Sequence, residues 1–208
     1  MTQKKNHNNY KFQSLPKSMI FSDKTITINR ELSELDIFTL EFIKILKKHS
    51  PYVIISGYVS ILLGRARSSE DIDILIPRIN FEHFRTLIHE LNKAGYYCLN
   101  ADADKNIYEY ITDKTAIRFA KQNTVIPNVE LKCAKNKIDD LTLAKTLTVK
   151  IPENNELIIS HLEMQIAFKE QVLKSPKDLE DARHIRNIAQ GHLDQNLIHE
   201  YEKMLYGF

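Results

Sequence analysis

The chain has 208 residues, 43% of them apolar, which is enough for one sizeable core or for a core with a smaller satellite. Its 29 Lys and Arg residues nearly balance its 27 Asp and Glu residues, which excludes strong attraction of the whole chain to polyanions. Two cysteines, Cys98 and Cys133, exclude a disulfide framework, and both are expected to be reduced core thiols.

The N-terminal region is predicted to be a flexible basic tail over residues 1–24. Its first twenty residues are polar, with four lysines and no acid. No apolar signal core opens the chain, and the longest apolar run, 52–64, is too short to cross a bilayer. We therefore expect a cytoplasmic protein without a membrane partner.

Residues 25–152 alternate between helical and strand-like patterns and are predicted to form an α/β core. Helices are expected at 33–48, 58–63 and 80–93, and strands at 52–56, 71–76, 96–99, 107–111, 115–120, 127–134 and 146–151. The composition shifts at Pro152, where IPENNE is predicted to be a linker. Residues 153–208 are predicted to form a C-terminal helical subdomain, with helices at 157–173, 175–190 and 194–205. The expected fold class is α/β (α+β), a mixed sheet flanked by helices and followed by a helical satellite.

Two carboxylates, Asp71 and Asp73, lie two positions apart on the strand 71–76 and project from one face. Carboxylates this close repel each other unless a cation lies between them. Mg²⁺ prefers hard oxygen ligands and keeps substrate phosphate in its coordination shell. The pair therefore predicts a magnesium site, although an isolated Asp-x-Asp is also compatible with an exposed strand carrying solvated acids.

A turn at Ser56–Gly57 joins the strand 52–56 to a short helix. Glycine lets phosphate oxygens approach the backbone, and Ser56 adds a hydroxyl. Arg65 and Arg67 follow in a basic loop, where they could contact a triphosphate or a polyanionic acceptor. A plain turn followed by a solvated loop is the alternative for this segment.

A third acid on a neighbouring strand would complete the metal site. Glu130 is the best candidate, because it lies in the clearest later strand, on the face opposite Val129 and Leu131. A cross-strand salt bridge with a lysine is the alternative role for Glu130. Lys132 shares its face, and Tyr58 is a further candidate that could stack on a base.

These residues resemble the signature of the nucleotidyltransferase-fold superfamily, the DNA polymerase beta-like proteins. Its members carry Gly-Gly or Gly-Ser, a short helix and then Asp-x-Asp, and Gly57 precedes Asp71 by fourteen positions here. Within the superfamily the chain most resembles the minimal AbiEii-like branch, which includes toxins of toxin–antitoxin pairs. Gly64 to Arg67 matches the Gly-x-x-Arg of that branch. The resemblance covers roughly residues 50–190.

The same resemblance extends to the C-terminal helices. It implies that Lys169 and Lys177 hold the triphosphate from across a cleft, with Asp178 and Asp181 in support. Helix capping by Asp178 and solvated lysines are the structural alternatives. The sequence departs from the family pattern in having Ser56 where Gly is common and Glu130 where Asp is usual.

The predicted activity is metal-dependent transfer of a nucleoside monophosphate from a nucleoside triphosphate to an acceptor hydroxyl. Asp71, Asp73 and Glu130 are expected to be catalytic and to bind two Mg²⁺ ions. Ser56, Gly57, Arg65, Arg67, Lys169 and Lys177 are expected to bind phosphate. The acceptor is expected to be RNA, tRNA or protein, in a toxin-like role with an antitoxin as partner. An antibiotic nucleotidyltransferase and a non-catalytic nucleotide-binding protein are the alternatives.

Overall fold

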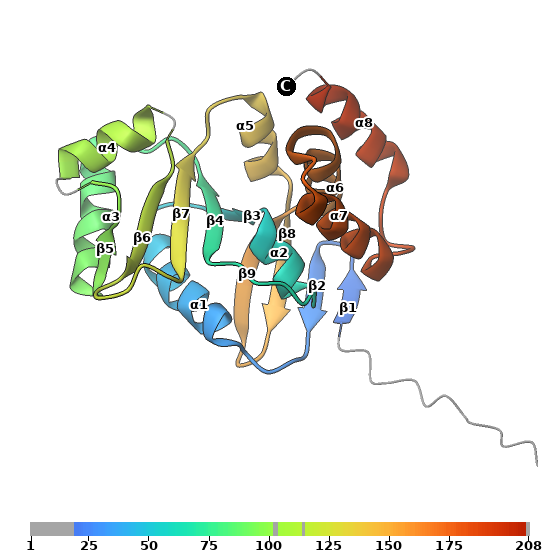
Figure 1. Ribbon diagram of the computed structural model, residues 1–208, viewed down its shortest axis with the longest axis horizontal. Helices are drawn as coiled ribbons and strands as arrows, with labels where there is room; N and C mark the ends of the chain where they lie inside the picture. The colour runs from blue at the N-terminus through green and yellow to red at the C-terminus, as the bar shows by residue number, and fades with distance from the viewer. Residues whose placement is uncertain (1–18, 102–103, 114, 207–208) are drawn as a thin grey trace, which may run out of the picture.

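The computed structural model describes residues 19–101, 104–113 and 115–206. Within these residues nine strands form one mixed sheet, in the order β1-β2-β8-β9-β3-β4-β7-β6-β5 (Figure 1). The strands are β1 (Met19–Ser22), β2 (Thr25–Ile28), β3 (Val53–Ile55), β4 (Asp71–Ile76), β5 (Tyr96–Cys98), β6 (Ile117–Lys121), β7 (Asn128–Cys133), β8 (Thr146–Ile151) and β9 (Asn155–Ser160). The helices are α1 (Glu34–Leu46), α2 (Gly57–Leu62), α3 (Phe81–Lys93), α4 (Asp104–Thr112), α5 (Lys137–Ala144), α6 (Leu162–Phe168), the π-helical segment η1 (Lys169–Leu173), α7 (Pro176–Ile188) and α8 (Gln195–Leu205). This confirms the predicted class, a mixed sheet flanked by helices.

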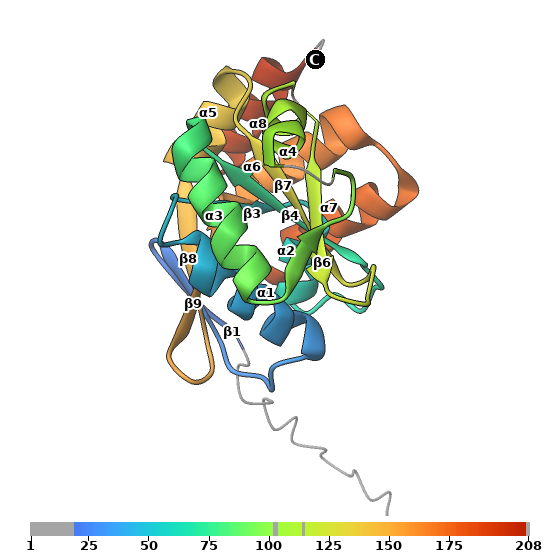
Figure 2. The ribbon, with the colours of Figure 1, turned by 90° about the vertical axis from the view of Figure 1, so that its left-hand side faces the viewer.

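One face of the sheet is the apolar core. Ile72 and Ile74 of β4 and Val129 of β7 are fully buried on it. Helices α1 and α3 cover this face (Figure 2), and Phe42 of α1 packs against Phe119 of β6 with ring centroids 5.9 Å apart. Because side chains alternate along a strand, the intervening polar residues of β4 and β7 point to the other face.

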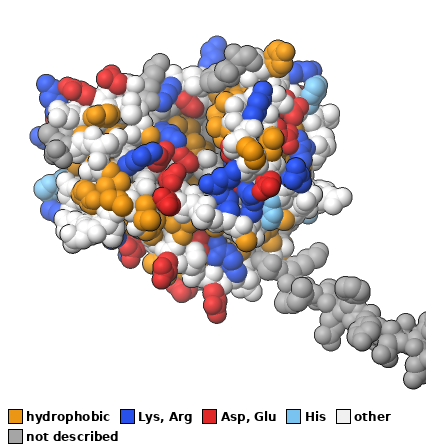
Figure 3. All heavy atoms as spheres, in the orientation of Figure 1, with side chains coloured by type: hydrophobic (Ala, Val, Ile, Leu, Met, Phe, Trp, Pro, Cys, Tyr) orange, Lys and Arg blue, Asp and Glu red, His pale blue; other side chains and the backbone are white. Residues whose placement is uncertain are grey.

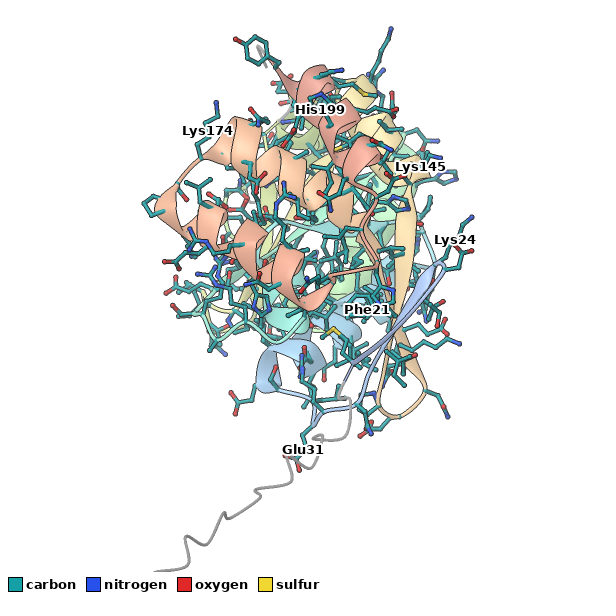
Figure 4. All side chains as sticks on the ribbon, turned by 90° about the vertical axis from the view of Figure 1, so that its right-hand side faces the viewer. Phe21, Lys24, Glu31, Lys145, Lys174 and His199 are labelled. Carbon is teal, nitrogen blue, oxygen red and sulfur yellow. The ribbon has the colours of Figure 1, made fainter. Side chains whose placement is uncertain are left out.

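The C-terminal helices pack on one another and against the sheet. Helix α6 contacts both α7 and α8, and α2 contacts α7. At the edge of the sheet, Phe21 of β1 stacks on His192 with ring centroids 4.9 Å apart; Figure 4 shows Phe21 close to these helices. In the described part of the chain, no helix is both long enough and apolar enough to traverse a lipid bilayer.

The expected secondary structure is wrong at three places. Residues 107–111 belong to helix α4, because Ile107 and Ile111, one helical turn apart, are both buried. Residues 155–160 are strand β9 rather than the start of a helix, and the expected linker is a tight turn in which Glu153 and Asn154 have positive φ. The helix predicted to begin at 157 begins at Leu162.

The segments predicted as an N-terminal tail and a C-terminal helical subdomain each contribute a strand to the sheet. Strand β9 lies between β8 and β3, so the first part of the predicted helical subdomain 153–208 is a central strand of the sheet. Met19–Ser22, within the predicted tail 1–24, form edge strand β1, while residues 1–18 lie outside the described residues. Strand β2 and helix α5 have no counterpart among the predicted elements.

A buried carboxylate connects α1 to α2. Asp36 is fully buried and accepts hydrogen bonds from Arg30 Nη1 and Tyr58 Oη, each at 2.6 Å, and from the Ser33 backbone N–H at 2.7 Å. Burial raises the pKa of Asp36, but these donors outweigh it and lower the pKa to about 2. Tyr58 is itself fully buried, so its predicted stacking on a base is wrong.

Replacing Asp36 by Asn should lower the free energy of unfolding by about 2 kcal/mol, because hydrogen bonds to a charged acceptor are lost inside the protein. The folded pKa of Asp36 is below its usual value, so its contribution is present above about pH 4 and is lost as the pH falls toward about 2. Chemical unfolding of wild type and variant across this pH range measures both effects. Glu34→Gln, an exposed acid in the same turn, is the control. An Asp36→Asn variant as stable as the control would contradict the role of this network.

Candidate functional site

The predicted carboxylates meet on the polar face of the sheet. Strands β4 and β7 are parallel, with Asp73 paired to Glu130, and β3 and β4 are antiparallel, with Ile55 paired to Asp73. Paired residues on neighbouring strands point to the same face. The side chains of Asp73 and Glu130 are 13% and 12% exposed, so both are partly withdrawn from solvent. Asp71 lies two positions before Asp73 on the same face.

Two cations neutralise Glu130. Arg118 of β6 donates from Nε to Glu130 Oε1 at 2.8 Å, and Lys132 Nζ lies 3.3 Å from Glu130 Oε2. Lys132 also forms an ion pair with Asp73. Burial alone would raise the pKa of Glu130, but Lys132 and Arg118 outweigh it and lower that pKa. Glu130 is therefore ionised at neutral pH and forms a cross-strand salt bridge, the alternative role considered from the sequence, with Arg118 of β6 as the cross-strand partner in place of a lysine.

Metal binding at this position depends on how the carboxylates are arranged. Among the described residues, no group of three or more His, Cys, Asp and Glu side chains is arranged to hold a metal ion. On this face Arg118 pairs with Glu130, whereas Asp71 and Asp73 form no ion pair with Arg118 in the part of the chain that the structure describes. The carboxylate oxygens of Asp71 and Asp73 are the hard ligands that Mg²⁺ prefers.

The turn at Ser56–Gly57 lies beside these carboxylates. Because Ile55 pairs with Asp73 in an antiparallel register, the chain leaves β3 next to the end of β4 that carries Asp71. Ser56 has φ 64° and ψ −135°, a backbone conformation that residues other than glycine rarely adopt. The surrounding structure therefore holds Ser56 in a strained conformation at the position where phosphate binding was predicted.

Arg67 covers Gly57. A Cβ atom at Gly57 would lie 2.9 Å from Arg67 Nη2 and 3.1 Å from Arg67 Cζ, so glycine is what allows the guanidinium to lie against the backbone. Burial and the neighbouring Arg65 lower the pKa of Arg67, whereas Asp178, Asp71 and Asp73 raise it. Arg67 thus lies against the turn, and its charge interacts with the carboxylates of Asp71 and Asp73.

A second buried carboxylate gathers the remaining cations. Asp181 of α7 is fully buried and forms ion pairs with Arg65, Arg67 and Lys169, the last at 2.8 Å. Lys169 is 1% exposed and lies at the start of η1, a π-helical segment of the kind often found at functional sites. Burial lowers the pKa of Lys169, and the nearby carboxylate of Asp178 partly offsets this effect. The Asp181 side chain therefore joins both arginines of the basic loop to Lys169 of the C-terminal helices.

The other predicted residues of α7 are placed differently. The Asp178 backbone N–H donates to Ser175 Oγ at 3.2 Å, and Asp178 Oδ1 lies 3.4 Å from Lys169 Nζ, so Asp178 has a role in capping and in the ion-pair cluster. Lys177 is exposed, and its carbonyl oxygen accepts a hydrogen bond from Arg65 at 3.1 Å. Figure 3 shows acidic side chains next to a group of basic ones in the middle of the molecular surface that it draws.

A cavity of about 360 Å³ adjoins the site. It lies between the polar face of the sheet and helices α5 and α6 with η1, and its lining includes Ser56, Lys132 and Lys169. Its remaining lining is largely apolar, with Leu75, Met164 and Phe168 among the residues. The size and lining are those of a small-molecule site with a few placed polar groups.

Three residues of the site were not assigned a role from the sequence: Lys132, Arg118 and Asp36. The alternation along 127–134 placed Lys132 on the face of Glu130, which was the available signal for it. Arg118 and Asp36 depend on strand pairing and helix packing, which no local pattern specifies.

Comparisons with known proteins give the class of fold. No family model matches the sequence, and no curated protein matches it. An antigenic nucleotidyltransferase-like protein from Paracoccidioides brasiliensis is similar in structure, with a TM-score of 0.50 and 16% identity over 84% of this chain and 88% of that one. The chain therefore has a nucleotidyltransferase-like fold, as the sequence resemblance implied.

Two further solved structures are also similar, at lower scores. The ANT(2″)-Ia structure in complex with adenylyl-2″-tobramycin has a TM-score of 0.48 and 16% identity over 81% of this chain and 97% of that one. The lincomycin-bound lincosamide antibiotic adenylyltransferase LnuA has a TM-score of 0.44 and 16% identity over 76% of this chain and 99% of that one.

Replacing Ser56 by Gly should raise the free energy of unfolding by about 1 kcal/mol, because glycine adopts this backbone conformation without strain. Ser68→Gly makes the same chemical change in an exposed loop whose φ is not positive, and it should leave stability unchanged or slightly lower. Chemical denaturation of both variants gives the comparison. Equal effects of the two substitutions would mean that Ser56 is not strained.

Replacing Asp181 by Asn should lower the free energy of unfolding by about 3 kcal/mol, because Arg65, Arg67 and Lys169 would lose their common buried counter-charge. Glu180→Gln removes an adjacent acid that is 59% exposed and pairs with Arg65 at the surface. Glu180→Gln is the control and should lower the free energy of unfolding by less than about 1 kcal/mol. Thermal and urea unfolding measure the difference, and a mild effect of Asp181→Asn would rule out the cluster as a structural link.

Proposed function

We propose that the protein transfers a nucleoside monophosphate from a nucleoside triphosphate to an acceptor hydroxyl. The observation that carries this proposal is the strand register around β4. It brings Asp71 and Asp73 next to the Ser56–Gly57 turn on one side and next to Glu130 on the other. Carboxylates for a cation and a turn with an adjacent arginine for phosphate are the two parts that such a reaction needs.

Mg²⁺ is the proposed cofactor, with Asp71 and Asp73 as its protein ligands. Bound there, it would neutralise phosphate charge and lower the pKa of the attacking hydroxyl. The carboxylate oxygens suit this ion, and their position on a strand of the central sheet keeps them fixed.

The chain's own side chains have separate proposed roles. Ser56 and the Gly57 backbone bind the triphosphate, and the Arg67 guanidinium stabilises negative charge as pyrophosphate leaves. Asp181 holds Arg67, Arg65 and Lys169 in place, so it is a positioning residue. Lys169, which lines the cavity and pairs with Asp181, and the exposed Lys177 are proposed to bind phosphate from the side of the C-terminal helices.

Glu130 is proposed to orient the acceptor. The reaction forms a bond between the acceptor oxygen and the α-phosphorus, breaks the bond from that phosphorus to the pyrophosphate oxygen, and releases the hydroxyl proton to solvent water. The lowered pKa of Glu130 makes it a weak general base, because an effective base has a pKa near the working pH. Its proposed contribution is therefore a hydrogen bond to the attacking hydroxyl.

The acceptor proposed first is a hydroxyl of RNA, tRNA or a protein. A toxin-like role, an antitoxin partner, membership of the AbiEii-like branch and a cytoplasmic location rest on the sequence alone. The cavity beside Ser56 favours a second candidate, a small molecule with a hydroxyl group. The charged lining of that cavity comprises Lys132, Lys135, Lys169 and one acid, Asp139, which makes it a poor match for a polycationic antibiotic.

Replacing Asp71 and Asp73 by Asn should lower nucleotidyl transfer by roughly 100-fold or more, because the cation that neutralises the phosphates loses both ligands. Each α-³²P-labelled nucleoside triphosphate is incubated with Mg²⁺ and, separately, with total RNA, cell protein and a small-molecule extract. Glu70→Gln, an exposed acid next to the pair, should behave as wild type. Label transferred by wild type and control alone identifies the nucleotide and the acceptor class. Equal background from all three proteins would favour the non-catalytic nucleotide-binding alternative.

A further inference from the structure

Lys132 occupies the position between two of the three carboxylates. Its ammonium forms an ion pair with Asp73 and lies 3.3 Å from Glu130 Oε2, so one positive charge bridges the two strands. The Lys132 side chain is 30% exposed, against 13% and 12% for its partners, so solvent reaches Lys132 more than it reaches the two carboxylates. This is the position that a bridging cation would take between two acids.

The other oxygen of Glu130 is also occupied. Arg118 donates from Nε to Oε1 at 2.8 Å, so both oxygens of Glu130 face a cation of this chain. A divalent ion bound by Asp73 and Glu130 together would therefore meet an ammonium and a guanidinium already in place. Like charges at such distances repel strongly where solvent is partly excluded.

Asp71 is in the opposite situation. Within residues 19–101, 104–113 and 115–206, its carboxylate forms neither a hydrogen bond nor an ion pair, although Arg67 is near enough to respond to its charge. Lys132 donates to Oδ1 of Asp73, and no hydrogen bond among the described residues involves Asp73 Oδ2. The oxygens without a cation of their own therefore belong to the Asp71–Asp73 pair.

We propose that the Lys132 ammonium is the resident cation of the Asp73–Glu130 pair, so that the protein binds one divalent ion, between Asp71 and Asp73, in place of two. This inference rests on the proposed function only in assuming that the carboxylates bind a divalent ion. The two-ion expectation drawn from the sequence treated Glu130 as a free ligand and assigned Lys132 no role. The structure gives Lys132 the charge and the position of the second ion.

Lys132→Met tests the proposal, because methionine keeps an unbranched chain of similar length and removes the charge. Mn²⁺ alone is titrated into the full-length protein, with bound ions counted by electron paramagnetic resonance and calorimetry. We expect one Mn²⁺ per wild-type chain, and either a second ion or at least tenfold tighter binding in Lys132→Met. Lys132→Arg, which keeps the charge, should resemble wild type. Lys150→Met removes a lysine that is 55% exposed on β8, distant from the site, and should also resemble wild type.

Thermal unfolding provides a second measurement that needs no activity. Without Mn²⁺, Lys132→Met should melt below wild type because Asp73 and Glu130 then repel each other, and Mn²⁺ should raise its Tm more than that of wild type. Equal stoichiometry and affinity for Mn²⁺ in wild type and Lys132→Met would overturn the proposal for Lys132. Two ions bound to both wild type and Lys132→Met would also overturn it, but would leave the proposed nucleotidyl transfer standing. No ion bound to either protein would overturn the metal-dependent function as well.

Discussion

The pairing of β4 with β3 and β7 is the constraint on which the rest of the site depends. Asp71 and Asp73 acquire neighbours only because β3 runs antiparallel on one side and β7 parallel on the other. A slip of one residue in either register would turn the carboxylates into the apolar core, where Ile72 and Ile74 are fully buried. The burial of those isoleucines beneath α1 and α3 therefore fixes the polar face as firmly as it fixes the core.

The second constraint is the single carboxylate of Asp181. It lies on α7, more than a hundred positions after the loop of Arg65 and Arg67, and it binds both arginines together with Lys169. This arrangement holds the Arg67 guanidinium against Gly57, where the chain has no side chain. Helix α7 thus positions a charge at a turn that belongs to the sheet, and the C-terminal helices become part of the site.

The sequence predicts some elements of the structure correctly and others not. Alternation over 71–76 predicted β4 with its bounds, and the spacing from Gly57 to Asp71 led to the correct class of fold. The sequence predicts a helix where strand β9 lies, because Leu157, Ile158 and Ile159 form a short apolar run whose period does not distinguish helix from strand. The pairing of β9 with β8 and β3 determines that it is a strand. The partners of Glu130 and Asp181 likewise follow from tertiary contacts that no local pattern encodes.

The charges of the site are arranged in pairs that differ in burial, and this difference explains their separate roles. Asp181 and Lys169 are almost fully buried, so their ion pair is protected from solvent and is suited to holding structure. Asp73, Glu130 and Lys132 are partly exposed, so their charges can respond to a ligand that arrives from solvent. Asp71 forms no ion pair among the described residues and is the carboxylate most open to an added cation. The gradient from a closed cluster on α7 to an open carboxylate on β4 therefore supports the proposal that a cation and its phosphate partner bind at the strand that carries Asp71 and Asp73.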